Sequence, residues 1–475
     1  MLGRTRRVHF VGIGGIGMSG IAELLVNLGY AVSGSDQKSS DVTGRLRSLG
    51  ARVELGHAAA HVGEADVVVV SSAVRPDNPE VAEARRRTIP VIARAEMLAE
   101  LMRLRSGIAV GGAHGKTTTT SMIAVVLERA GLDPTAVIGG KLSAFGSNAR
   151  LGSGPYMVVE ADESDRSFLR LTPTVAVITN IDHEHLEAYR DFDDLCGAFL
   201  DFANKVPFYG AIVACADDEH VRALLPRMTR RVVTYGLESD GADVTGSDVR
   251  QDQEQWICRV NVSPRGLAAL GHAAGTAFEP RDLRLQVPGR HNLRNGLAAV
   301  SVGLELGVPL AVVVDALASF TGADRRFQRR GEADGVLVID DYGHHPTEIA
   351  AVIEAARATL ARRIIAVVQP HRYTRTSMLM DRFGPALQQA DEVVLTDIYA
   401  AGEDPIPGAT VEALASAINA HRARPVHVSK TLDAVVPTVL AVARPGDVVL
   451  MLGAGSINSL GERVLAELRR REGGR

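Results

Sequence analysis

The chain has 475 residues, which is enough for about three domains of ordinary size. Hydrophobic residues make up 46% and charged residues 23% of the chain, values typical of a globular protein with well-filled cores. The formal net charge is −4 and the basic residues are scattered, so neither nucleic acid nor an anionic membrane is expected as a partner.

Cysteine usage and hydropathy indicate the compartment. Cys196, Cys215 and Cys258 are far apart and form no C-x-x-C pair, which argues against a structural zinc site or a disulfide framework. The basic start MLGRTRR is not followed by the apolar run and cleavage site of a signal peptide. No uncharged apolar run approaches the roughly 18 residues that a membrane span requires. We therefore expect a cytoplasmic protein with no membrane partner.

The first third of the chain alternates between strand-like and helix-like runs, as parallel α/β folds do. It opens with VHFVGIGGIGMSGIAELL, an apolar strand that runs into glycines and then into a helix. Gly12, Gly14 and Gly17 fit the pattern G-x-G-x-x-G, and Asp36 follows about 20 residues further on. Such a turn holds a diphosphate against a helix N-terminus. Taken alone, the motif indicates NAD.

A second phosphate loop follows in GIAVGGAHGKTTTTSMIAVVLERAG, which predicts a strand, a glycine loop and a helix. The loop is shorter than the full G-x-x-x-x-G-K-[ST] pattern, because residue 110 is Val. Lys116 is placed to reach the β- and γ-phosphates of ATP, and the hydroxyl of Thr117 suits Mg²⁺. The predicted ATP-binding loop consists of Gly112, Ala113, His114, Gly115, Lys116, Thr117 and Thr118.

Acidic and imidazole groups follow the next two predicted strands. YMVVEADESD runs into Glu160, with Asp162, Glu163 and Asp165 behind it. A phosphate-bound Mg²⁺ needs an acid at the end of a neighbouring strand, so Glu160 is a candidate ligand. TVAVITNIDHEHLE repeats the arrangement with His183 and His185, and one imidazole there is a candidate for a second divalent ion.

The pattern changes after residue 240. Short patches such as QWICRVNV and DLRLQV predict small antiparallel strands attached to the second unit, followed by the helical runs HNLRNGLAAVSVGLEL and PLAVVVDALASF. TGADRRFQRRGEADG is the best linker candidate, and a third α/β unit runs from VLVIDD to DVVLMLGAG. We predict a Rossmann-like domain over residues 1–104, a P-loop ATPase-like domain over 105–322 with a small antiparallel addition, and a Rossmann-like domain over 323–475.

The third predicted domain carries groups suited to anions. DDYGHHPTE and QPHRYTRT each follow an apolar strand, at the edge where open α/β sheets bind ligands. Arg372 and Arg375, beside His371, suit a carboxylate or a phosphate. No nicotinamide chemistry is visible, so the economical interpretation is that the first domain holds a nucleotide-linked substrate while the second holds ATP.

These motifs follow one another in one order along the whole chain: VGIGGIGMSGIAE, GGAHGKTTTT, VVEADESD, TNIDHEH, VPGRHNLRN, GADRRF, DDYGHHPTE, QPHRYTRT and DIYAAGE. As a set they resemble the Mur ligases of bacterial cell-wall synthesis, and most nearly their alanine-adding branch. The resemblance implies one domain for a UDP-sugar, one for ATP and a third that closes over both and binds the amino acid. It also implies that the lactyl carboxylate of UDP-N-acetylmuramate takes the γ-phosphoryl group of ATP, and that L-alanine attacks the resulting acyl phosphate.

The resemblance assigns expected roles to residues of this chain. The UDP end would be held by Gly12, Gly14, Gly15, Gly17, Asp36, Ser71 and Ser72. The ATP site would include, besides the loop, His291, Asn292, Asn295, Arg326 and Asp341. Substrate carboxylate and alanine would meet Tyr342, His344, Arg372 and Arg375. The metal ligands would be Thr117, Glu160 and His185. The catalytic set would be His114, Lys116, Glu160, His185, His344, Arg372 and Arg375, with His114 facing the reacting carboxylate.

Two departures and three alternatives stay open. Several Mur ligases carry a carbamylated lysine in the helix after the NID segment, but Phe199 stands near that place here and Lys205 comes too late. No residue is plainly the general base for the alanine amine. The alternatives are a recycling ligase that adds a tripeptide to the same sugar nucleotide, an NAD-dependent oxidoreductase, and a non-catalytic module switched by ATP. The sequence leaves open a monomer or a homodimer.

Overall fold

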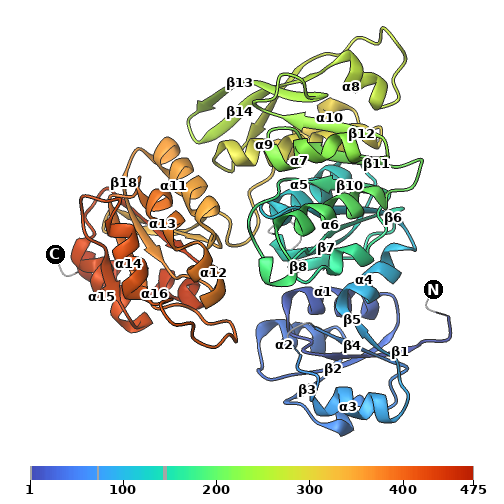
Figure 1. The fold of residues 1–475 in the computed structure, drawn as a ribbon, viewed down its shortest axis with the longest axis horizontal. Helices are drawn as coiled ribbons and strands as arrows, with labels where there is room; N and C mark the ends of the chain where they lie inside the picture. The colour runs from blue at the N-terminus through green and yellow to red at the C-terminus, as the bar shows by residue number, and fades with distance from the viewer. Residues whose placement is uncertain (1–2, 72–73, 143–146, 474–475) are drawn as a thin grey trace. The chain divides into compact units, whose positions relative to one another are not determined.

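The computed structural model describes residues 3–71, 74–142 and 147–473 (Figure 1). Three separate β-sheets organise these residues, each with its own helices. The predicted three-domain α/β architecture is confirmed. Spatial clustering of the backbone divides the chain into two compact units. The first unit comprises Met1–Asp248, Cys258–Leu283 and Arg294–Phe320, and the second Val249–Ile257, Arg284–Leu293 and Thr321–Arg475.

The N-terminal sheet has five parallel strands in the order β3-β2-β1-β4-β5. The strands are β1 (Arg7–Val11), β2 (Ala31–Asp36), β3 (Arg52–Leu55), β4 (Val67–Val70) and β5 (Val91–Ala93). The helices are α1 (Ile16–Asn27), α2 (Asp41–Ser48), α3 (Pro79–Arg86) and α4 (Arg94–Met102). The strand order reverses beside β1, and this switch point is where open α/β sheets bind ligands. The Rossmann-like prediction is therefore confirmed.

The central sheet has ten strands in the order β15-β14-β13-β12-β11-β10-β6-β9-β7-β8. Its parallel part contains β6 (Ser106–Gly111), β9 (Tyr156–Glu160), β10 (Val175–Ile178), β11 (Ala211–Cys215) and β12 (Val232–Gly236). Helices α5 (Lys116–Arg129), α6 (Phe192–Asn204) and α7 (Glu219–Leu224) accompany these strands. At one edge, β7 (Thr135–Leu142) and β8 (Ser147–Arg150) form an antiparallel pair for which the sequence offered no prediction.

The predicted antiparallel addition is present and extends the central sheet. It consists of β13 (Val244–Asp252), β14 (Gln255–Val262) and β15 (Arg281–Leu285), with α8 (Pro264–Ala269). Only two residues connect β13 to β14, and such a short connection joins antiparallel neighbours. The two predicted helical runs form α9 (Arg290–Glu305) and α10 (Leu310–Ala318).

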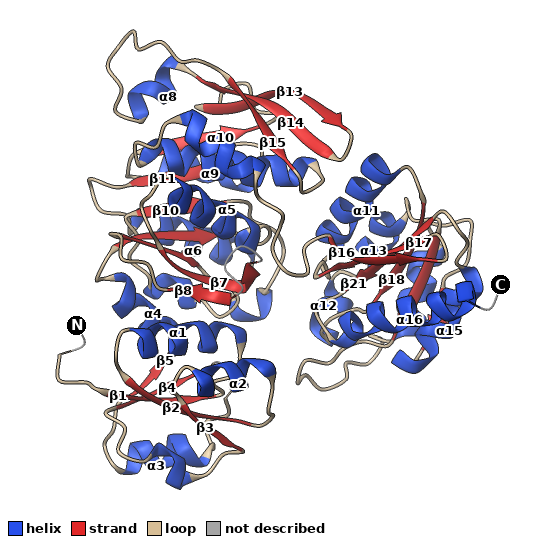
Figure 2. Cartoon of the chain, turned by 180° about the vertical axis from the view of Figure 1, so that it is seen from behind, coloured by secondary structure: helices blue, strands red, loops and turns tan. Residues whose placement is uncertain are grey.

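The C-terminal sheet has six strands in the order β16-β17-β21-β18-β19-β20. Figure 2 shows part of this sheet, with β16, β17, β18 and β21 labelled, together with helices of the same domain. The six strands are β16 (Gln328–Ala333), β17 (Val336–Asp341), β18 (Arg363–Val368), β19 (Glu392–Thr396), β20 (His427–Ser429) and β21 (Asp447–Leu452). The helices are α11 (Pro346–Leu360), α12 (Tyr373–Met378), α13 (Met380–Leu387), α14 (Val411–Asn419), α15 (Leu432–Val442) and α16 (Leu460–Gly473). All neighbouring strands are parallel except β16 and β17.

The linker prediction is wrong for the second half of its segment, because β16 lies there and pairs with β17. Asp334 and Gly335 form the connection with φ angles of 49° and 71°. An Asp-Gly pair with positive φ at both residues is typical of a tight hairpin turn. This hairpin places β17, which ends in the predicted anion-binding segment, inside the sheet.

Burial follows the spacing expected of each element. On α16 the buried residues include Leu460, Val464, Leu465 and Leu468, which recur every three or four residues and pack with the faces of β16 and β17. Within residues 3–71, 74–142 and 147–473, no helix is long and apolar enough to cross a membrane.

Candidate active site

The glycine turn after β1 lines a pocket of about 780 Å³ in the N-terminal domain. Gly12 has a φ of 80°, and the backbone N–H of Gly14 donates to Asp36 Oδ2 at 2.8 Å. A Cβ atom on Gly14 would lie 2.9 Å from that same oxygen, so a side chain there would push the turn away from Asp36. Because these glycines carry no side chains, the backbone of the turn can face a ligand in the pocket directly.

The pocket brings together most of the residues expected at the UDP end. Its lining includes Gly12, Gly14, Gly15, Asp36 and Ser71. Gly17 lies apart from the lining, and a Cβ there would be 2.8 Å from the guanidinium of Arg94. Ser72 lies outside the described residues. His57, Lys38 and Arg75 also line the pocket, and none of them was predicted from the sequence. His57 lies two residues after the end of β3, and this position near a strand end was the available signal.

The P-loop joins β6 to α5 in the central domain. Gly112 and Gly115 have φ angles of 140° and 82°, conformations that side-chain-bearing residues rarely adopt. The loop is held from outside: the N–H of His114 donates to Asn180 Oδ1 at 2.8 Å. Gly115 is the N-cap of α5 and carries no side chain to cap the helix, so the first backbone N–H groups face whatever anion the loop binds.

Lys116 is the first residue of α5, and its side chain folds back over the loop. Its Nζ donates to the carbonyl oxygens of Gly112 at 2.6 Å and Ala113 at 3.1 Å, and forms an ion pair with Glu163 at 2.8 Å. Burial alone would lower the pKa of Lys116, but the carboxylate of Glu163 raises it above its ordinary value. The lysine is therefore charged at neutral pH, and its ammonium lies where phosphate oxygens would enter the loop.

Two of the three predicted metal ligands, Thr117 and Glu160, are adjacent. Glu160 ends β9, and the hydroxyl of Thr117 donates to Glu160 Oε2 at 3.3 Å. The other carboxylate oxygen accepts the N–H of Gly139 at 2.6 Å. A hydroxyl beside a carboxylate is the oxygen-donor set that Mg²⁺ prefers next to phosphates.

A second group of possible metal ligands lies in the same domain. Glu163, Glu184 and His185 each offer one ligand atom, and these atoms all lie within 4.8 Å of one another. The side chains of Glu163 and Glu184 are only 2% and 6% exposed. Glu163 Oε2 is buried and has no hydrogen-bond partner in the part of the chain that the structure describes. Of these three residues, only His185 was predicted as a metal ligand. Glu163 follows β9 whereas Glu184 follows β10, and no local pattern indicates that the two carboxylates meet.

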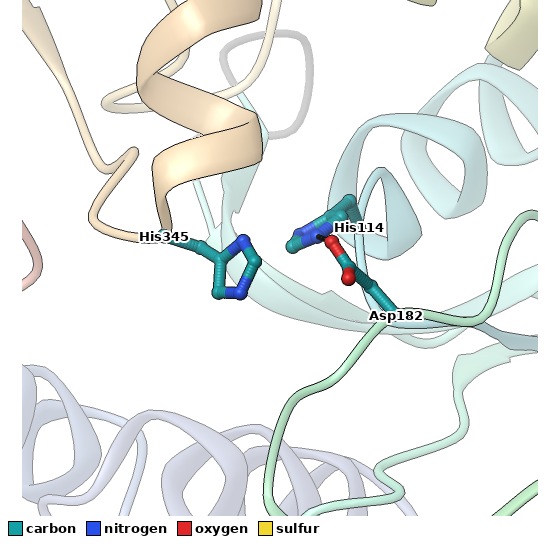
Figure 3. Close-up of side chains that lie close together, drawn as sticks. All are labelled: His114, Asp182 and His345. Atoms are coloured by element: carbon teal, nitrogen blue, oxygen red, sulfur yellow. Dashed lines mark hydrogen bonds and ion pairs between the residues drawn. The ribbon is translucent and has the colours of Figure 1, made fainter. Parts of the chain in front are cut away.

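His114 and Asn295 also lie beside this loop. The imidazole Nε2 of His114 is 3.0 Å from Asp182 Oδ2 (Figure 3). A Cβ on Gly115 would be 2.6 Å from the side-chain oxygen of Asn295, which places α9 against the P-loop. His291 and Asn292, from the first turn of α9, belong to the second unit, where Asn292 Nδ2 donates to the carbonyl of Pro288 at 2.7 Å.

The lysine bridge expected in other family branches has no counterpart at its position in α6. Phe199 is fully buried and packs edge-on against Phe168, with ring centroids 5.2 Å apart. Lys205 follows the helix as its C-cap and donates to the carbonyl of Leu169. In these contacts, neither Phe199 nor Lys205 interacts with Glu163, Glu184 or His185.

The C-terminal domain collects its predicted residues at the carboxyl ends of β17 and β18. His344 Nδ1 is 3.0 Å from the carbonyl of Tyr342, and the His344 and His371 rings are 5.3 Å apart. Arg375 is buried, and its Nη1 lies 3.1 Å from His371 Nδ1. Arg372 has a φ of 71°, and its Nη1 is 3.8 Å from Glu403 Oε1.

Asp341 and Arg326 form the other side of this edge. Asp341 accepts the N–H groups of Phe327 and Gly343, both at 2.7 Å. Burial raises the pKa of Asp341 to about 6, although Arg326 and the two N–H groups act in the opposite direction. The guanidinium of Arg326 lies 5.3 Å from the centroid of the Tyr342 ring. A cation and a buried carboxylate therefore stand beside the predicted anion-binding groups of the same domain.

Three family models match the chain in succession. They are the Mur ligase family catalytic domain over residues 7–106, the Mur ligase middle domain over 110–303, and the Mur ligase glutamate ligase domain over 325–455. The chain belongs to the Mur ligase family. The resemblance seen in the motifs is thereby confirmed.

Individual Mur ligases match over nearly the whole chain. A UDP-N-acetylmuramate–L-alanine ligase of Anaeromyxobacter sp. is 55% identical over 98% of this chain and 98% of its own. The crystal structure of the UDP-N-acetylmuramate–alanine ligase MurC of Thermotoga maritima superimposes with a TM-score of 0.81 at 30% identity, covering 98% and 99% of the two chains. A murein peptide ligase of Psychrobacter arcticus shares the fold, with a TM-score of 0.71 at 24% identity over 98% and 99%.

Gly115 provides a direct test of the P-loop geometry. Gly115→Ala should weaken ATP binding about tenfold or more, because the new Cβ meets Asn295 and strains a positive φ. Gly131→Ala is the matched control, since Gly131 has a φ of 74° and open space around its Cβ position. Titration with ATP should show near-normal affinity for Gly131→Ala. Equal affinities in the two variants would contradict the P-loop assignment.

Proposed function

We propose that this chain is a UDP-N-acetylmuramate–L-alanine ligase that acts in peptidoglycan precursor synthesis. The observation that carries the proposal is the match to an L-alanine ligase over 98% of both chains at 55% identity. The geometry agrees with two nucleotide sites of different kinds, a glycine-turn pocket in the N-terminal domain and a P-loop in the central domain. ATP is a substrate, as it is throughout the Mur ligases.

The reaction forms an amide at the expense of ATP. An oxygen of the lactyl carboxylate attacks the γ-phosphorus of ATP, ADP leaves, and an acyl phosphate forms. The amine of L-alanine then attacks the acyl carbon, loses a proton, and expels phosphate together with that carboxylate oxygen. Both steps bring anions together, so they depend on positioning and on neutralising charge. Lys116 and the N–H groups at the start of α5 would hold the ATP phosphates.

The remaining site residues serve the same two tasks. His114 would face the reacting carboxylate, while His291, Asn292, Asn295, Arg326 and Asp341 would hold ATP. Tyr342, His344, Arg372 and Arg375 would receive the substrate carboxylate and L-alanine. Gly12, Gly14, Gly15, Gly17, Asp36, Ser71 and Ser72 would hold the UDP end.

Mg²⁺ is the proposed metal. Thr117 and Glu160 would hold one ion, which suits their adjacent oxygen atoms. Glu163, Glu184 and His185 would hold a second, which would provide a partner for the buried Oε2 of Glu163. Bound there, divalent ions neutralise charge on the phosphates and the carboxylate.

The proposal also includes the organisation of the chain. Residues 1–104 would bind the UDP-sugar, 105–322 would bind ATP, and 323–475 would close over ATP and bind the amino acid. We place the protein in the cytoplasm, where its nucleotide substrates occur, and expect a monomer or a homodimer.

An amino-acid scan separates this function from its rivals. Phosphate release is measured with UDP-N-acetylmuramate, ATP and Mg²⁺ plus each amino acid, or plus the tripeptide that a recycling ligase adds. We expect release that requires the sugar nucleotide and is fastest with L-alanine. Release with the tripeptide but not with L-alanine would assign the chain to the recycling branch. A change at the nicotinamide absorbance band without ATP would indicate an oxidoreductase, and nucleotide binding without phosphate release under any mixture would indicate a binding module.

A further inference from the structure

A buried carboxylate lies directly behind the nucleotide pocket of the N-terminal domain. The side chain of Glu80 is fully buried, near the start of α3. It accepts hydrogen bonds from His9 Nε2 at 2.8 Å, from the hydroxyl of Ser35 at 2.7 Å and from the N–H of Ala58 at 3.1 Å. Glu80 Oε1 is also 3.3 Å from His57 Nδ1. Of the groups around this carboxylate, His57 is the one that lines the pocket.

These contacts determine which ring nitrogen of His57 carries a proton. The hydroxyl of Ser35 donates to Glu80 and can therefore only accept from His57 Nδ1, which is 3.0 Å away. Burial alone would raise the pKa of Glu80, but the hydrogen bonds from His9 and Ser35 lower it to about 2. Glu80 is therefore an acceptor at neutral pH. Both neighbours of His57 Nδ1 accept, so Nδ1 bears the hydrogen.

The other nitrogen of His57 is left for the pocket. In the neutral imidazole with a hydrogen on Nδ1, Nε2 is a hydrogen-bond acceptor. Among the described residues, no hydrogen bond joins Nε2 to the protein, and the side chain is 17% exposed. The pocket wall therefore presents one oriented acceptor at this point, fixed by a network that its ligand does not touch.

The position of His57 matches the base end of a bound nucleotide. The glycine turn follows β1, Asp36 ends β2, and His57 follows β3, and these strands are neighbours in the sheet. A diphosphate on the turn places the ribose near the acid that ends β2. The base then extends over the end of β3, where His57 lies.

We infer that His57 selects uracil in the nucleotide-linked substrate by accepting a hydrogen bond from the uracil N3–H at Nε2, with Ser35 and Glu80 acting as positioning residues for its tautomer. Cytosine carries an acceptor at N3, so it would face Nε2 with lone pair against lone pair. This inference rests on the proposed UDP-sugar function and adds the determinant of base choice.

The test compares UDP, CDP and N3-methyl-UDP as ligands of the full-length protein by calorimetric titration. Wild-type protein should bind UDP at least about tenfold more tightly than either analogue, the loss expected when a buried acceptor is left unpaired. In His57→Phe, which keeps a ring but has no acceptor, UDP affinity should fall to within about threefold of CDP. In His57→Gln the side-chain amide can turn either its oxygen or its nitrogen to the base, so UDP and CDP should both bind well.

His61→Gln is the matched control. His61 Nδ1 is 3.4 Å from the same Glu80 oxygen, but His61 does not line the pocket, so the UDP/CDP ratio should stay at the wild-type value. Glu80→Gln should reduce the ratio without removing any group from the pocket. Slow hydrogen–deuterium exchange of the β1 and β2 amides verifies that the N-terminal domain is folded in each variant.

The outcomes distinguish the inference from the function on which it rests. Tight UDP binding with equally tight CDP or N3-methyl-UDP binding in the wild type would overturn the inference and leave the ligase function in place. Tighter binding of CDP than UDP would mean that Nε2 donates, and it would overturn the inference as well. Failure to bind UDP and UDP-N-acetylmuramate at all would overturn both.

Discussion

Lys116→Ala is expected to lower the rate of amide formation by about 10³-fold or more while UDP affinity remains at the wild-type value. The ammonium of Lys116 lies within the P-loop, 2.6 Å from the carbonyl of Gly112, where the β- and γ-phosphates would enter. Without it, the charge that develops during phosphoryl transfer loses its fixed cation. The pocket proposed for UDP is lined by the glycine turn of another domain, so calorimetric UDP binding should not change.

Two further variants keep this prediction decisive. Lys116→Met retains most of the side-chain volume in case truncation beside the buried Glu163 prevents folding. Lys430→Ala removes an exposed lysine that pairs with Glu412, and its rate should equal that of the wild type. A comparable loss of UDP affinity in Lys116→Ala, or near-normal turnover in a folded Lys116 variant, would contradict the assignment of ATP to the P-loop.

Glu80→Ala is expected to lower the free energy of unfolding of the N-terminal domain by about 3–5 kcal/mol, because three buried hydrogen bonds to the carboxylate are lost, at about 1–3 kcal/mol for each donor left without an acceptor. The substitution leaves His9, which is also fully buried, without its partner at 2.8 Å. Hydrogen–deuterium exchange of β1 and β2 amides in urea reports the opening of this domain. Glu64→Ala is the control, because Glu64 is 84% exposed and, within the part of the chain that the structure describes, forms an ion pair only with Arg7. This substitution should cost no more than about 1 kcal/mol.

Glu80 should also make the stability of the N-terminal domain depend on pH in the acid range. The pKa of Glu80 is lowered from 4.5 to about 2, so its ionised form contributes stability above pH 4.5 that is lost as the pH falls toward 2. The loss amounts to about 3 kcal/mol in the wild type. Glu80→Gln should therefore be less stable than the wild type at pH 7 and should lose less stability across this interval. If Glu80→Gln lost as much stability as the wild type between pH 4.5 and pH 2, the proposed contribution of the Glu80 network would be contradicted.

Regular elements were predictable because each left a local signal. The predicted strands QWICRVNV, residues 255–262, and VLVIDD, residues 336–341, have the same bounds as β14 and β17. Each combines apolar or β-branched residues with flanking turn residues. By contrast, β16 lies at a sheet edge and consists largely of polar and charged residues, so its sequence shows no alternation of apolar and polar residues. Strand β7 contains Gly139, Gly140 and Lys141 in succession, which also hides the alternation.

Candidate site residues could be proposed from the sequence where a motif placed a side chain at a strand end. Glu160 at the end of β9 and Thr117 near the start of α5 lie next to each other, as the spacing led us to expect. What the sequence could not supply was pairing between distant segments. Glu163 with Lys116 and Glu80 with His57 depend on the packing of separate elements, which no local pattern encodes.

The fate of one oxygen atom tests the account most directly. UDP-N-acetylmuramate labelled with ¹⁸O in its lactyl carboxylate is incubated with ATP, Mg²⁺ and L-alanine, and the released phosphate is examined by mass spectrometry. If the carboxylate is phosphorylated and then displaced by the amine, each phosphate should carry one labelled oxygen, and release should cease when L-alanine is omitted. Release of unlabelled phosphate, or release that does not require the sugar nucleotide, would contradict the proposed ligase reaction.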